Sequence, residues 1–171
     1  MPAPAPRSVL ALDVGRRRIG LAGCDALGLT VTPLQALRRG NFSDDLGKLL
    51  LLARQRHVSA LVVGLPLSAS AEPTPQSHHC RRYGLALRHG LAERGLDLPL
   101  AWVNEHSSSW EAAERFGLRG DRSGRLDSLA AALLLEQWLR EGPEPQTPQR
   151  RGDPDGVATI HGGEPSTAAA L

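Results

Sequence analysis

Residues 10–25, "LALDVGRRRIGLAGCD", contain an apolar run that ends in an acidic residue, Asp13, followed by a glycine and three arginines. The apolar residues on either side of "GRRR" predict two strands, over 9–14 and 19–24, joined as a β-hairpin with Gly15 near the turn. A carboxylate on a buried strand is unfavourable unless something compensates its charge. Asp13 is therefore expected to have a partner, and a metal ion, the turn itself or a phosphate group could each be that partner.

Further elements follow this hairpin along the chain. Residues 29–34 predict a third strand, and a stripe of leucines in 46–53 predicts a helix with Ser43 as its N-cap. The uninterrupted apolar run "ALVVGLP" (60–66) predicts a strand that is buried on both faces.

The second half of the chain predicts helices that alternate with one more strand. Thr74 and Pro75 have the residue types of an N-cap and a first helical position, and Gly95 ends that helix. A strand over 98–104, a short helix over 108–116 and a helix over 127–140 follow. Three strands followed by alternating helices and strands predict an α/β fold with a mixed sheet flanked by helices.

Composition sets the class of protein and the extent of its folded part. The chain has 171 residues, 41% of them apolar, and no apolar run reaches the roughly 18 residues that span a membrane. We expect a cytoplasmic protein, because the N-terminus lacks a signal-peptide core and two cysteines suit a reducing compartment. Residues 8–141 are predicted to form one domain, with 1–7 and the Pro/Gly-rich tail 142–171 disordered.

Three carboxylates stand where predicted elements begin or end. Asp13 ends the first strand, Glu105 follows the strand 98–104, and Asp127 begins the last helix. Converging carboxylates bind hard divalent cations, and two such ions about 3.5–4 Å apart promote phosphodiester hydrolysis. Each residue also has a purely structural interpretation, as a turn residue, a solvated loop residue and a helix cap respectively.

Four motifs together resemble the YqgF/RuvX family: "LALDVGRRRIGLAGCD", "VVGLPLSA", "WVNEHSSSWEA" and "RLDSLAAALLLEQWL". Members of this family are ribonuclease-H-like proteins described as pre-16S rRNA nucleases or Holliday junction resolvases. The resemblance implies a five-stranded sheet whose first three strands are antiparallel. It also implies that Asp13, Glu105 and Asp127 form a catalytic trio that binds Mg²⁺ or Mn²⁺, with a two-metal site.

The sequence departs from the family pattern beside the second acid. The family usually has Asp-Glu-Arg followed by Thr or Ser, whereas this chain has Asn104-Glu105-His106 and then serines. A glycine usual in the loop after "GLP" is also missing. We expect His106 and Ser108 to contact substrate.

The three arginines of the hairpin, Arg16, Arg17 and Arg18, have two interpretations that the sequence leaves open. They could bind a phosphate backbone beside the acids, or they could form a solvated hairpin tip.

The resemblance implies a metal-dependent nuclease that acts on structured RNA, in 5′-end processing of pre-16S rRNA during ribosome biogenesis. The alternatives are a Holliday junction resolvase, acting on branched DNA in recombination and repair, and a nucleic-acid-binding module with a decayed active site. A resolvase would be a symmetric homodimer, whereas the RNA nuclease could be a monomer or a homodimer. No membrane partner is expected.

Overall fold

The computed structural model describes residues 8–68, 70, 72–104, 117 and 123–142. Five strands in these residues form one sheet in the order β3-β2-β1-β4-β5. The strands are β1 (Ser8–Val14), β2 (Arg18–Cys24), β3 (Val31–Arg38), β4 (Val58–Leu65) and β5 (Leu100–Asn104). β2 is antiparallel to β1 and β3, whereas β4 is parallel to β1 and β5 to β4. The predicted mixed sheet with an antiparallel first half is confirmed.

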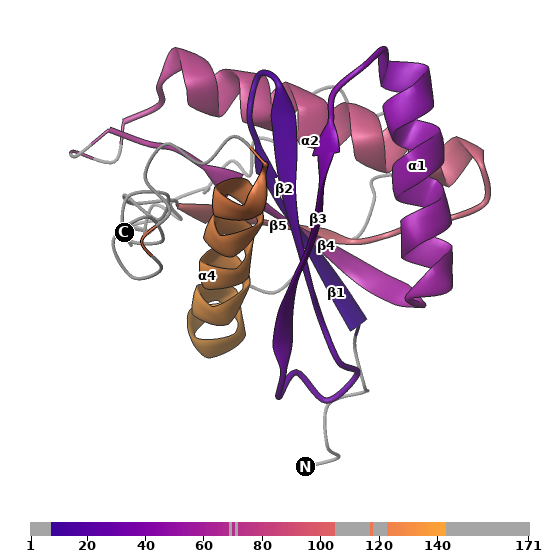
Figure 1. Ribbon diagram of the computed structural model, residues 1–171. Helices are drawn as coiled ribbons and strands as arrows, with labels where there is room; N and C mark the ends of the chain where they lie inside the picture. The colour runs from indigo at the N-terminus through magenta and orange to yellow at the C-terminus, as the bar shows by residue number, and fades with distance from the viewer. Residues whose placement is uncertain (1–7, 69, 71, 105–116, 118–122, 143–171) are drawn as a thin grey trace, which may run out of the picture.

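Helices cover both faces of this sheet (Figure 1). α1 (Phe42–Gln55) and α2 (Pro75–Glu93) lie on one face, and α4 (Arg125–Glu141) lies on the other. The predicted helix over 108–116 lies outside the described residues. None of the helices in the described ranges is both long enough and apolar enough to cross a membrane.

The alternation of side chains along β1 divides the core into two clusters. Leu10, Leu12 and Val14 belong to the cluster under α1 and α2, whereas Val9 and Ala11 belong to the cluster under α4. Because successive side chains of a strand point to opposite faces, Asp13 belongs to the α4 side of the sheet. Asp13 is half-buried there, one residue before the strand ends.

The third strand begins later and continues further than predicted. β3 starts at Val31 and runs to Arg38, instead of covering 29–34. Asp25 explains the late start of β3, because its Oδ1 accepts the backbone N–H groups of Leu29 and Thr30 at 2.7 and 2.8 Å. These bonds fix the two residues in the turn before the strand, as aspartate side chains commonly do.

Two of the predicted helix starts were wrong. Asn41 caps α1 by accepting the N–H of Asp44 at 2.9 Å, so Ser43 lies inside the helix. α4 starts two residues earlier than predicted, and its N-cap is Gly124 with a φ of 88°. Asp127 is therefore a first-turn residue and not a cap. The predicted cap of α2 is confirmed, with Thr74 accepting the N–H of Ser77 at 3.0 Å.

Candidate functional site

The hairpin between β1 and β2 places Asp13 next to a glycine. The turn closes through the N–H of Gly15, which donates to the carbonyl of Arg18 at 2.9 Å. In the resulting register Asp13 lies directly opposite Gly20 on β2. Residues opposite each other in an antiparallel pair share a face of the sheet, so both lie on the α4 side.

Gly20 allows α4 to begin directly against the sheet. A Cβ on Gly20 would overlap the backbone carbonyl of Asp127 and lie 2.9 Å from the nitrogen of Ser128. The hydroxyl of Ser128 accepts the N–H of Leu21 at 3.4 Å, which ties the same turn to β2. The first turn of α4 therefore packs beside the Asp13–Gly20 pair, and residues far apart in the sequence meet there.

Asp127 forms an ion pair with one of the three hairpin arginines. Its Oδ2 lies 3.2 Å from Nε of Arg18, and each side chain is about one-third exposed. Sequence reasoning assigned both residues to the site but missed their contact. Strand parity places Arg18 on the same face of β2 as Gly20, two residues later, but its contact with Asp127 also depends on where α4 docks.

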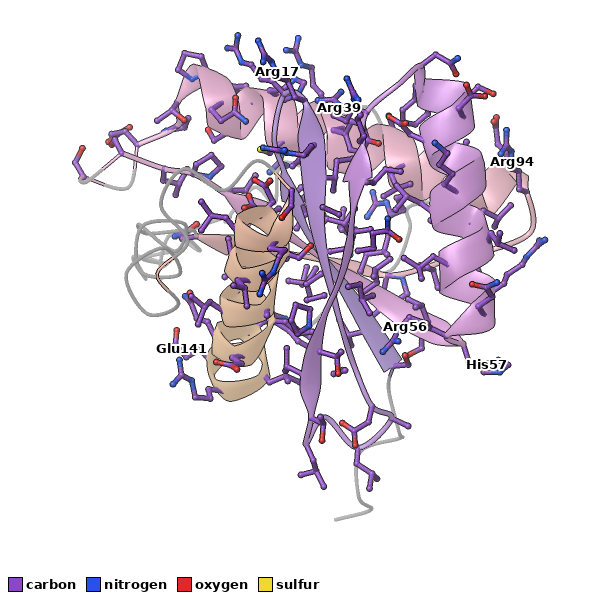
Figure 2. All side chains as sticks on the ribbon, viewed as in Figure 1. Arg17, Arg39, Arg56, His57, Arg94 and Glu141 are labelled. Carbon is purple, nitrogen blue, oxygen red and sulfur yellow. The ribbon has the colours of Figure 1, made fainter. Side chains whose placement is uncertain are left out.

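The other two arginines of the hairpin, Arg16 and Arg17, are exposed at its tip. The tip is held by Arg39, whose Nη1 donates to the carbonyl of Gly15 at 2.9 Å. The backbone N–H of Arg39 also donates to the carbonyl of Arg17 at 2.9 Å. Figure 2 shows Arg17 and Arg39 at the same end of the molecule. Sequence reasoning missed Arg39, which is the residue that orients this turn.

A histidine of α2 completes the support of the hairpin. Nε2 of His79 lies 2.8 Å from Nη1 of Arg39. Burial lowers the pKa of His79, and the positive charges of Arg39, Arg82 and Arg16 lower it further. A histidine with a lowered pKa is neutral at pH 7 and can accept a hydrogen bond from a guanidinium. Arg39, Arg82 and Arg16 thus place positive charge around His79 at this end of the sheet.

The remaining predicted site residues, Glu105, His106 and Ser108, lie outside the described residues. The described part of the chain reaches Asn104, the last residue of β5, which pairs with Leu65 of β4. Val103 belongs to the cluster under α4, so β5 contributes to the same face of the sheet as Asp13.

The residues present suit a divalent cation, although the described ranges contain no group of three His, Cys, Asp or Glu side chains that could hold a metal ion. Asp13 and Asp127 supply carboxylate oxygens, which are the donors that Mg²⁺ and Mn²⁺ prefer. Both side chains are partly accessible, and Gly20 leaves no side chain of its own between them. Cys24 and Cys80 are both buried in the apolar core, away from these carboxylates.

Known proteins resemble nearly the whole of this chain. A protein of Synechococcus sp. (strain CC9605) named "Putative pre-16S rRNA nuclease" is 62% identical over 160 residues, which are 94% of this chain and 98% of the relative. A protein of the same name from Parasynechococcus marenigrum (strain WH8102) is 61% identical, covering 94% and 99%. A solved structure, T. thermophilus RuvC in complex with a Holliday junction substrate, aligns with 16% identity and a TM-score of 0.48, covering 80% of this chain and 96% of that one. The family model described as "RuvX: Holliday junction resolvase" matches residues 7–141, and the chain therefore belongs to the RuvX family.

Proposed function

We propose that this chain is a metal-dependent nuclease that hydrolyses phosphodiester bonds in structured RNA, with precursor 16S rRNA as its substrate. The observation that carries the proposal is the approach of α4 to Gly20, which brings the first turn of that helix against the strand position opposite Asp13. The choice of RNA rests on the names of relatives that are about 60% identical over 94% of the chain.

Asp13, Glu105 and Asp127 are the residues that would hold Mg²⁺ or Mn²⁺. Bound there, such ions would supply activation of a water molecule and stabilisation of the leaving oxygen of a phosphodiester. Glu105 is included because it directly follows β5, whose Val103 faces α4. The choice of Glu105 as the third carboxylate otherwise rests on the resemblance of "WVNEHSSSWEA" to the family motif.

Arginine side chains of this chain are suited to bind the phosphates of a nucleic-acid substrate. Arg16 and Arg17 are exposed at the tip of the hairpin that follows Asp13, and their planar guanidinium groups match the oxygens of a phosphate. Arg39 and His79 orient the turn that carries them. Ser108 and His106 would contact the nucleic acid from the segment after β5.

The decisive experiment offers purified protein a 5′-extended pre-16S rRNA fragment and a four-way DNA junction, each with and without Mn²⁺. We expect the RNA to be cut only with Mn²⁺, and the matched variant Asp13→Asn to bind the RNA without cutting it. The circular dichroism spectrum of the variant should equal that of the wild type, because removing one of several like charges relieves repulsion in the metal-free protein.

Other results would contradict the proposal in distinct ways. Full activity of Asp13→Asn would remove this residue from the mechanism. RNA binding without cleavage, combined with no binding of Mn²⁺ in a calorimetric titration, would identify a nucleic-acid-binding protein with a decayed site.

The second candidate function is the resolution of Holliday junctions, which the description of the matching family model favours. A resolvase cuts two strands related by a two-fold axis, so it works as a symmetric dimer. Cleavage of the junction but not of the RNA, by a protein that sediments as a dimer, would support this alternative. A protein that is strictly monomeric with the junction bound would exclude it.

A further inference from the structure

A cavity lies beside Arg18, the residue that pairs with Asp127. It has a volume of about 700 Å³, and its described lining comes from the hairpin, from β3 and from the residue before the N-cap of α4. The lining residues are Arg17, Arg18, Gln35, Ala36, Arg38 and Ser123. Arg18 therefore contacts Asp127 and also forms part of the wall of this cavity.

A β-bulge shapes the cavity. Ile19 pairs with Leu37 and Leu21 with Leu34, so two residues of β3, Gln35 and Ala36, lie opposite the single residue Gly20. Bulges twist a strand and redirect its side chains, and they are frequent beside active sites. Here both residues of the bulge line the cavity, and the bulge lies opposite the glycine that pairs with Asp13.

The described lining of the cavity carries three arginines and no carboxylate. Arg18 and Arg38 lie directly opposite each other on β2 and β3. Like charges in this position destabilise a sheet, so the pair is unfavourable for the fold by itself. Asp127 compensates Arg18, but no described carboxylate lies within 4.0 Å of the guanidinium group of Arg17 or Arg38.

We propose that this cavity binds a backbone phosphate of the nucleic acid, one or more nucleotides away from the bond that is cut. The inference rests on the proposed nuclease function and extends its substrate surface across β2 to the edge strand β3. Arg17 and Arg38 would supply the charge, and the side-chain amide of Gln35 can donate a further hydrogen bond to a phosphate oxygen.

A nucleic acid fits this cavity better than an acidic protein segment does. Arg18 joins the cavity to Asp127, so a chain in the cavity is continuous with the proposed cleavage site. A polymer with a phosphate at every residue can occupy both places at once. Phosphate also accepts forked hydrogen bonds from arginine, which is the only cation type in the described lining.

The test compares Arg38→Gln with the matched control Arg140→Gln. Arg140 is an exposed arginine in the last turn of α4, at the end of the helix far from the cavity. Figure 2 marks that far end with Glu141, the neighbour of Arg140, and the cavity end with Arg17. RNA binding is measured by fluorescence anisotropy in Ca²⁺ at several salt concentrations, so that the readout does not depend on cleavage.

We expect Arg38→Gln to weaken RNA binding about three- to tenfold and the control to leave it unchanged. The slope of log K against log salt should fall by about 0.7–0.9, the loss of one phosphate contact. The melting temperature of Arg38→Gln should equal or exceed that of the wild type, because the like-charge pair with Arg18 is removed.

Failure of this inference can be told apart from failure of the proposed function. An unchanged salt slope for Arg38→Gln in a protein that still cleaves RNA would overturn the cavity proposal alone. A changed slope in a protein that never cleaves RNA would support the cavity and contradict the nuclease. Weaker binding of a poly-glutamate peptide, with RNA binding unaffected, would assign the cavity to an acidic protein partner and overturn the inference.

Discussion

The two faces of the sheet are lined by side chains of very different size. The face under α1 and α2 contains large aliphatic residues, among them Leu10, Leu12, Leu21, Leu61 and Leu100. The face under α4 contains mainly small residues of the strands, among them Ala11, Ala22, Ala60 and Ala101, together with Gly20 beside Asp127.

This difference separates stability from the candidate site. Large buried side chains remove the most apolar surface from water, so the α1/α2 face contributes most of the hydrophobic free energy. Small side chains allow a helix backbone to come close to a strand, and on the α4 face this brings Asp127 to Gly20. Substitutions on the first face should therefore change folding, and those near Gly20 should change activity.

The largest effect is expected from Leu12→Ala, one residue before Asp13 but on the opposite face. Leu12 is fully buried, so the substitution should lower the free energy of unfolding by about 2–5 kcal/mol. The melting temperature should fall by about 4–20 °C in a chain of this length. Cleavage per folded molecule, measured well below the transition, should stay near the wild-type rate. Loss of that rate in a fully folded variant would contradict the division between the faces.

Gly20→Ala should act mainly on activity. Its Cβ would collide with backbone atoms of α4, which cannot rotate away as a flexible side chain can. The start of α4 must shift, and a shift of about 1 Å in a catalytic group can lower a rate about a hundredfold. Overpacking should also lower stability by about 1–3 kcal/mol.

Gly47→Ala provides the control for this variant. Gly47 lies within α1, and a Cβ there would meet a single atom, Nη1 of Arg94 at 4.0 Å. The control should raise stability by about 0.5–1 kcal/mol, because alanine restricts the unfolded chain, and leave cleavage unchanged. A wild-type cleavage rate for Gly20→Ala would show that the position of α4 does not matter to the reaction.

A smaller effect is expected from His106→Arg, which restores the residue type usual in the family. If position 106 contacts a phosphate, a permanent charge should bind RNA up to about tenfold more tightly than a mostly neutral histidine at pH 8. At pH 5.5 the histidine gains its proton, and the difference should narrow. The comparison requires binding in Ca²⁺ at fixed salt. Equal affinities at both pH values would show that this position does not touch substrate.

The smallest effect is expected from deletion of residues 145–171. The segment offers little apolar surface to either face, so the melting temperature should change by less than about 2 °C. A loss of many degrees in a thermal scan would mean that part of the tail packs against the domain.

Much of this fold could be predicted from the sequence because its signals are local. The hairpin around "GRRR", the buried strand β4 and the Thr74–Pro75 helix start all follow from residues that are neighbours in the chain. The errors were local as well. Asn41 and Ser43 are both good N-caps, and only the hydrogen bond to Asp44 distinguishes them.

The candidate site was less predictable because it depends on contacts between distant segments. The acids could be named from the sequence, but the Arg18–Asp127 pair and the contact of Gly20 with α4 depend on how the helix docks. Arg39 has no sequence signal of its own, since its role comes from bonds to Gly15 and His79 across the fold. Register and parity can suggest such contacts only when the strand order is known.

The docking of α4 has a consequence for protein synthesis. Leu21 and Ser128, which bond at this contact, are 107 residues apart in the chain. During translation the N-terminal strands emerge first, and contacts of long sequence separation form last. The first turn of α4 can reach β2 only after almost the entire folded part has left the ribosome. A nascent chain would therefore lack the proposed cleavage site, and we expect newly made protein to cut RNA only after α4 has docked on β2.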